Sequence, residues 1–69
     1  MSKSMIKFAE NLKLLIRDKS VMNIAKEIGI PHQTLQRYLH CEREIKLDYL
    51  VKIADYFDED IDVLTGRKP

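Results

Sequence analysis

The chain has 69 residues, a net charge of +1, two histidines and one cysteine. Its length suffices for one small domain with a modest hydrophobic core. The lone Cys41 excludes an internal disulfide, and with His32 and His40 it makes a poor set of metal ligands, so neither a metal nor another cofactor is expected. No apolar run is long enough to cross a membrane and no secretory signal is present, which favours a cytoplasmic protein.

Charge is distributed unevenly along the chain. Residues 1–40 contain seven Lys and Arg against three Asp and Glu, a net of +4, whereas residues 41–69 contain five against eight, a net of −3. A basic face and an acidic end are therefore expected. The nearly neutral total is weak evidence against nucleic-acid binding, because a local basic patch is enough to engage phosphates.

Two helices are predicted in the first part of the chain. The first, over about residues 4–17, carries apolar residues on one face at Phe8, Leu12, Leu15 and Ile16. The second is predicted over residues 21–28, with Ser20 as the N-cap whose hydroxyl accepts from a free amide. Gly29 follows its last apolar residue, where the chain is expected to turn through a left-handed conformation.

Pro31 opens a third helix, because its fixed φ and its missing N–H suit the start of a helix. The inner face of this helix carries Leu35, Tyr38 and Leu39. The hydroxyl of Tyr38 is expected at the edge of the core, and the same is expected of Tyr49 and Tyr56. Two short helices joined by a glycine-containing turn indicate a helix-turn-helix unit over about residues 21–40.

After a charged, aperiodic loop at residues 41–46, a fourth helix is predicted. Its apolar residues recur at spacings of three and four: Leu47, Leu50, Val51, Ala54 and Phe57. Asp60 is predicted to cap a short last helix carrying Ile61, Val63 and Leu64, and residues 66–69 to form a tail. No segment alternates for long enough to be a strand, so residues 1–69 are predicted to form one all-α domain of five helices.

The segment IAKEIGIPHQTLQRYL, followed by LDYLVKIADYFDEDIDVLTG, resembles the XRE (Cro/lambda-repressor-like) helix-turn-helix family of bacterial and phage regulators. The resemblance covers about residues 8–66. Its most specific parts are Ile24-Ala25, Ile28-Gly29-Ile30, Thr34-Leu35, and Leu50 with Ile53-Ala54 before Phe57. It implies a five-helix lambda-repressor-like DNA-binding domain, in which the small Ala25 lets the second and third helices cross closely.

The resemblance also implies which residues contact DNA. In this family the third helix lies in the major groove, and the residues that match its base-reading positions are His32, Gln33, Gln36 and Arg37. Glutamine can pair with adenine and arginine with guanine, while histidine can donate or accept. The implied phosphate contacts are Ser20, Thr34, His40 and Arg43.

Several positions depart from the family pattern. Val21 stands where Gln is frequent, and Cys41 stands where Gly commonly follows the third helix. The loop that follows is usually basic, but here Glu42 and Glu44 flank Arg43, which weakens the expected grip on phosphate. An ion pair that many members have between the first and third helices is replaced by two apolar residues, Ile16 and Leu39, so no unpaired charge is buried there.

Two hypotheses for function follow. The first is a sequence-specific double-stranded DNA-binding regulator, a repressor, that acts as a homodimer on a palindromic operator with residues 61–64 near the dimer surface. The alternative is a protein-interaction module on the same fold, such as an antitoxin or an adaptor, which the acidic C-terminal half leaves open. No nucleophile–base pair and no phosphate-binding glycine loop are apparent, so an enzyme is not predicted.

Overall fold

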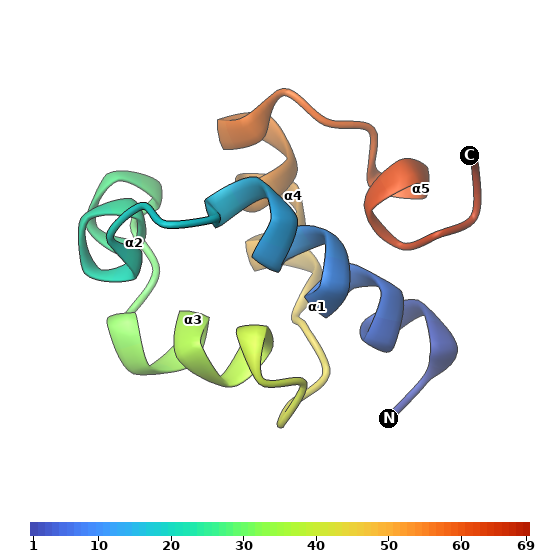
Figure 1. Cartoon of the computed structure of the whole chain (residues 1–69), viewed down its shortest axis with the longest axis horizontal. Helices are drawn as coiled ribbons and strands as arrows, with labels where there is room; N and C mark the ends of the chain where they lie inside the picture. The colour runs from blue at the N-terminus through green and yellow to red at the C-terminus, as the bar shows by residue number, and fades with distance from the viewer.

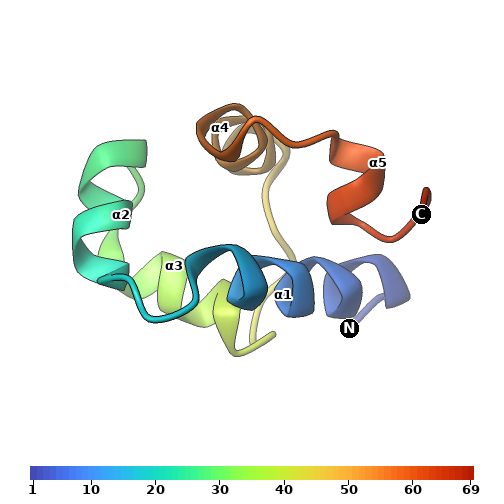
Figure 2. The same ribbon diagram turned by 45° about the horizontal axis from the view of Figure 1, so that its top comes forward.

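In the computed structural model, which describes residues 1–69, the chain forms five α-helices and no strand. They are α1 (Lys3–Ile16), α2 (Val21–Ile28), α3 (His32–Leu39), α4 (Leu47–Phe57) and α5 (Ile61–Leu64). The prediction of an all-α fold of five helices is therefore confirmed. Figure 1 shows α1 between α3 and α5, with the C-terminus beside α5 and the N-terminus at the start of α1. Figure 2 shows α4 facing α1 across the molecule.

Side-chain caps fix where three of the helices begin. The hydroxyl of Ser20 accepts a hydrogen bond from the Asn23 amide (3.2 Å), and a carboxylate oxygen of Asp60 accepts one from the Asp62 amide (2.7 Å), so both predicted caps are confirmed. Ser2 caps α1 in the same way, and this helix begins and ends one residue earlier than predicted. Each cap satisfies an amide that the first turn of a helix leaves without a partner.

The ends of the helices use left-handed residues. Gly29, with φ 88°, terminates α2, which confirms its predicted conformation. After α3, the Cys41 amide donates to the Tyr38 carbonyl (3.1 Å) and the Glu42 amide donates to the Arg37 carbonyl (2.9 Å), which closes a Schellman motif. Cys41 holds the left-handed position at φ 55°, at a cost of roughly 1–2 kcal/mol that a glycine avoids. Three non-glycine residues have positive φ: Arg17, Cys41 and Asp58.

The core consists of 15 buried residues, all of them apolar or aromatic. From α1 it receives Met5, Phe8, Ala9, Leu12 and Ile16, and from α3 it receives Leu35, Tyr38 and Leu39. The predicted apolar pair is buried, since Ile16 is 2% and Leu39 is 7% exposed. Ala25 is also buried where α2 and α3 are in contact, as its small side chain allows.

Two of the apolar residues that recur at helical spacing in the fourth helix are not buried. Leu47 is 72% exposed and Val51 is 40% exposed. The buried residues of α4 are Leu50, Ile53 and Ala54. At ~100° per residue these three span about 100° of the helix surface, and Leu47 and Val51 lie about 20° and 60° beyond Ala54, towards the outer face. Spacings of three and four mark an apolar stripe, but they do not say how much of the stripe a neighbouring helix covers.

Residues 66–69, predicted as a tail, fold back towards α5. The Nζ atom of Lys68 lies 3.8 Å from a carboxylate oxygen of Asp60 and 3.6 Å from one of Asp62. Both pairs are exposed to solvent, so they contribute little to stability. They nevertheless bring the basic chain end beside the acidic residues of α5.

Tyr38 is fully buried, and its hydroxyl makes no hydrogen bond. Its ring packs edge-on against Tyr49, with 6.3 Å between the ring centroids. The expected position of the hydroxyl at the edge of the core is therefore wrong for Tyr38, because its neighbours enclose the ring and the hydroxyl alike. The expected core packing is also wrong for Tyr56, which is 41% exposed.

Replacing Tyr38 with phenylalanine should raise the free energy of unfolding by about 1 kcal/mol or more. The reason is that a buried hydroxyl without a partner carries a desolvation penalty of roughly 1–3 kcal/mol, and phenylalanine removes it without leaving a cavity. Urea unfolding should show a higher midpoint with an unchanged slope. Tyr49→Phe is the matched control, since Tyr49 is only half-buried and its change should be small. A loss of stability in Tyr38→Phe would contradict the expectation.

Candidate nucleic-acid interface

The turn between α2 and α3 sets the geometry of the helix-turn-helix. The amides of Gly29 and Ile30 both donate to the Ala25 carbonyl, at 2.9 and 3.0 Å, which ends α2 sharply. Ile30 is 4% exposed and ties the turn to the core. Pro31 lies at the N-cap position, immediately before the first helical residue of α3, and it supplies no side-chain cap. Three residues thus redirect the chain from one helix into the next.

The exposed face of α3 carries polar side chains only. Gln33 and Arg37 are exposed and, at ~100° per residue, lie about 160° around α3 from Leu35, whereas the half-buried Gln36 lies at the side, about 100° from Leu35. His32 lies half-buried at one margin of this face. The four residues predicted to read bases therefore form one continuous surface on a helix whose other side is buried.

His32 and Gln36 interact with each other one helical turn apart. The Nε2 atom of Gln36 lies 3.4 Å from the Nε2 atom of His32, and the amide donates when the imidazole carries its proton on Nδ1. This contact orients the Gln36 amide and leaves its carbonyl oxygen and second N–H free. One acceptor and one donor are what the edge of adenine requires from glutamine.

The start of α2 presents free hydrogen-bond donors. The Ser20 oxygen accepts from the Asn23 amide, so its own hydroxyl hydrogen remains available. The amides of Val21 and Met22 make no backbone hydrogen bond. The dipole of α2 favours an anion at this end. Valine replaces the polar side chain frequent in the family, but its backbone donor is still present.

The start of α3 is open in the same way. Because Pro31 gives no side-chain cap, the amides of His32, Gln33 and Thr34 have no partner. The Thr34 side chain is half-buried at the margin of the exposed face. Two helix N-termini therefore offer donors to anions, one at each helix of the unit.

The far end of α3 places His40 and Arg43 in solvent. His40 is the C-cap residue, and both side chains are exposed. Of the two glutamates beside Arg43, Glu44 accepts hydrogen bonds from the amide (2.8 Å) and the hydroxyl (3.2 Å) of Ser2. Arg43 forms no ion pair. These hydrogen bonds tie Glu44 to Ser2 but leave its negative charge in place, so the weaker grip of this loop on phosphate stays a prediction.

Two basic residues that were not predicted as site residues, Lys13 and Arg17, line a pocket together with His40. A shallow pocket of about 180 Å³ lies where α1 ends, α2 begins and α3 ends, and it is lined by Lys13, Ile16, Arg17, Val21, Leu39 and His40. Neither Lys13 nor Arg17 forms an ion pair. No sequence signal links residues 13 and 17 to residue 40, because only the packing of α1 against α3 brings them together.

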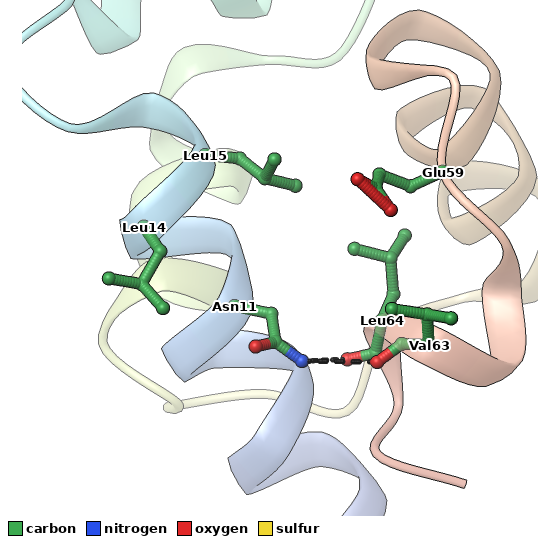
Figure 3. Close-up of a pocket in the computed structure, with 6 residues that line it drawn as sticks. All are labelled: Asn11, Leu14, Leu15, Glu59, Val63 and Leu64. Carbon is green, nitrogen blue, oxygen red and sulfur yellow. Dashed lines mark hydrogen bonds between the residues drawn. The ribbon is translucent and has the colours of Figure 1, made fainter. Parts of the chain in front are cut away.

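A second pocket of about 180 Å³ lies between α1 and α5, lined by Asn11, Leu14, Leu15, Glu59, Val63 and Leu64 (Figure 3). The Asn11 side-chain amide donates to the carbonyls of Val63 (3.2 Å) and Leu64 (2.9 Å) and so holds α5 against α1. Leu14 is 67% exposed at the rim. Leu64 is only 1% exposed, so within the predicted dimer surface it is not available for contact, whereas Ile61 is 36% exposed.

A side-chain hydrogen bond joins α4 to α2, the first helix of the helix-turn-helix. The Tyr56 hydroxyl donates a short hydrogen bond to the Glu27 carboxylate and joins α4 to α2. This hydrogen bond, together with the negative charge of Glu27, raises the pKa of Tyr56 above its ordinary value of 10.0. The contact is exposed and serves to orient α2 more than to stabilise the fold.

Two classes of site can be compared with the structure directly. No group of three or more His, Cys, Asp or Glu side chains is arranged to hold a metal ion. No helix has the length and apolar character that spanning a membrane requires.

A family model described as helix-turn-helix matches residues 17–64, which include all of α2 to α5 and 48 of the 69 residues. No curated protein and no solved structure matches the chain.

Changing Glu27 to glutamine should lower the pKa of Tyr56 towards 10, because the neutral amide no longer disfavours the tyrosinate. In the wild type, loss of the Tyr56 proton breaks the hydrogen bond and sets two negative charges side by side, so the contact raises the pKa of Tyr56. A pH titration of the tyrosine ring signals by NMR measures the shift. An unchanged Tyr56 titration would show that the contact does not form in solution.

Proposed function

This chain belongs to the helix-turn-helix family of DNA-binding regulators, of the XRE type, and we propose that it recognises a specific double-stranded DNA sequence as a transcriptional repressor. The observation that carries the proposal is the exposed face of α3, where four hydrogen-bonding side chains stand on a helix whose other side is buried. Such a face fits the major groove, into which an α-helix can be inserted. No catalytic step and no cofactor enter this proposal.

The base-reading roles follow from side-chain chemistry. Arg37 is exposed and free of ion pairs, so its guanidinium is available to the O6 and N7 atoms of guanine. Gln33 and Gln36 each offer the donor and the acceptor that adenine requires. His32 orients Gln36 and can meet a base at the margin of the face. We assign base reading to these four side chains.

Contacts with the DNA backbone fix how α3 enters the groove. We assign them to Ser20 and Thr34 at the starts of α2 and α3, and to His40 and Arg43 beyond the end of α3. The free amide donors at both helix starts support the first pair, since phosphate binding at helix N-termini combines hydrogen bonds with the helix dipole. The exposure of His40 and Arg43 supports the second pair.

The same proposal includes a homodimer on a palindromic operator. One eight-residue recognition helix reads too few base pairs for high specificity, and two-fold related half-sites lie one helical turn, ~34 Å, apart. Figure 1 shows α3 and α5 on opposite sides of α1. We place the second copy on the α1–α5 side, where Leu14 is exposed, because a dimer formed there keeps the two α3 helices apart. The longest dimension of one chain, 28 Å, is comparable with the ~34 Å between half-site centres.

In this reading residues 1–69 act as one DNA-binding domain. The bipolar charge also favours contact between two copies, because the basic first part of one can face the acidic last part of the other. Such a regulator works where bacterial or phage DNA lies, in the cytoplasm.

Selection from a random DNA pool by the purified protein, at salt near physiological, tests the proposal. The expected product is an enriched sequence with two inverted half-sites whose centres lie one helical turn apart. Affinity for it should fall steeply as salt rises, because bound counterions are released from the phosphates. A pool that shows no enriched sequence would overturn the proposal.

Changing Arg37 to alanine should relax the preference at one base position of each half-site and cost ~1–3 kcal/mol of binding there. Preferences at the other positions should persist, because the remaining side chains read other bases. Repeating the selection with the variant measures both effects. Lys19→Ala is the matched control, since Lys19 is exposed and lies outside α3. A uniform loss at every position would assign Arg37 to a phosphate instead.

Two substitutions at Ser20 separate its structural role from its role on DNA. Ser20→Ala removes the cap and should lower stability by about 1 kcal/mol. Ser20→Asp keeps a capping oxygen and suits the helix dipole, so stability should be retained, but its charge should repel a phosphate and weaken DNA binding. Thermal unfolding and a DNA titration of both variants provide the comparison. Full DNA affinity in Ser20→Asp would remove Ser20 from the interface.

One observation favours a second candidate, a protein-interaction module such as an antitoxin or an adaptor. The outer face of α4 carries exposed Leu47 and Val51 together with Asp48 and Asp55, and neither aspartate forms an ion pair. An acidic and partly apolar surface suits a basic protein partner better than DNA. If Arg37→Ala leaves DNA binding untouched while a protein partner is lost, this second reading is the correct one.

A further inference from the structure

The pocket lined by Lys13, Ile16, Arg17, Val21, Leu39 and His40 has a divided lining. Its floor consists of Ile16, Leu39 and the half-buried Val21. Its rim carries the side chains of Lys13, Arg17 and His40, and no carboxylate lines it. A ligand that matches both parts has one negative charge and an apolar body. A bare inorganic anion leaves the floor uncovered, and a neutral hydrocarbon leaves the cations without a partner.

The basic side chains at the rim are free to bind. Neither Lys13 nor Arg17 forms an ion pair, and the one hydrogen bond from the Arg17 side chain runs from Nε to the Leu14 carbonyl (3.2 Å). The other N–H groups of the Arg17 guanidinium remain available. The unpaired Val21 amide at the start of α2 adds a backbone donor beside the floor.

The backbone at Arg17 is strained, which makes a sharp test of its side chain possible. Arg17 has φ 55° and ψ −122°, a conformation that a side chain makes costly and a glycine adopts readily. The chain nonetheless carries an arginine there, at the rim of the pocket. Glycine at this position therefore removes the side chain and relieves the backbone at the same time.

We propose that this pocket binds a small organic carboxylate with a short apolar chain or ring, and that the bound acid weakens DNA binding. The carboxylate is held by Lys13 and Arg17, and the apolar body covers Ile16, Val21 and Leu39. The proposed function assigns phosphate contacts to His40 and to the start of α2, and the weakening of DNA binding by the acid rests on that assignment. A bound carboxylate neutralises the same positive region and so competes with the DNA backbone.

The first experiment follows amide shifts by NMR while hexanoate is added to the whole chain at fixed ionic strength and pH 7. Saturable shifts are expected at Val21, Leu39 and His40. Acetate, which has the charge without the body, should need at least tenfold more ligand, because burial of each CH₂ favours the longer acid. Hexan-1-ol and inorganic phosphate should bind less well than hexanoate. Equal titrations with hexanoate, acetate and phosphate would overturn the proposal and leave only a general anion patch.

Variants locate the site. Arg17→Gly relieves the strained backbone, so it should fold at least as well as the wild type, yet hexanoate binding should weaken at least tenfold. Lys13→Gln should weaken binding in the same direction. Lys19→Gln is the matched control, an exposed lysine that does not line the pocket, and should leave binding unchanged. Wild-type hexanoate binding in Arg17→Gly and Lys13→Gln would overturn the assignment.

The second experiment adds hexanoate to the complex with the selected DNA. A loss of DNA affinity is expected that acetate at the same concentration does not produce. Unchanged DNA affinity with a filled pocket would overturn the regulatory step alone. A protein that binds no DNA would overturn the proposed function, whereas the amide titration without DNA still decides whether the pocket binds carboxylates.

Discussion

The interface depends on the burial of one side of α3 against α1. An eight-residue helix is not stable alone in water, so packing rather than propensity holds α3 in place. Leu35, Tyr38 and Leu39 provide that packing, and burying an apolar side chain of this size contributes about 1.5–3 kcal/mol. Because the rotation per residue is fixed, burying these three leaves Gln33 and Arg37 on the outside. The burial of one side of α3 therefore determines the direction in which its polar face points.

Local signals account for what could be predicted from the sequence. The apolar spacing located all five helices, and Ser20 and Asp60 marked two starts because a cap acts within one turn. Gly29 marked the turn because few other residues adopt its φ. The polar residues of α3 could be named as a group because the apolar ones had to face inwards. Their roles on DNA came from resemblance to a family, and those roles stay predictions.

Properties that depend on several helices at once could not be predicted from the sequence. Lys13 and Arg17 lie far along the chain from His40, and only the folded arrangement puts them around one pocket. Leu47 lies in a regular apolar pattern, yet nothing covers it. The enclosure of the Tyr38 hydroxyl depends on side chains from other elements. Periodicity reports which face of a helix is apolar, but the depth of burial is decided by neighbours that the pattern does not contain.

The positive-φ residues Arg17, Cys41 and Asp58 stand at the ends of three helices, away from the base-reading face. Each retains a side chain where glycine would be less strained, so each is a position at which a single substitution can add stability. Stability gained at these helix ends can offset destabilising substitutions elsewhere in the chain. A regulator that changes its operator must accept new residues on α3, some of which destabilise the helix. Gains at the helix ends can offset such losses, so a descendant of this chain can alter the sequence that it reads and still fold.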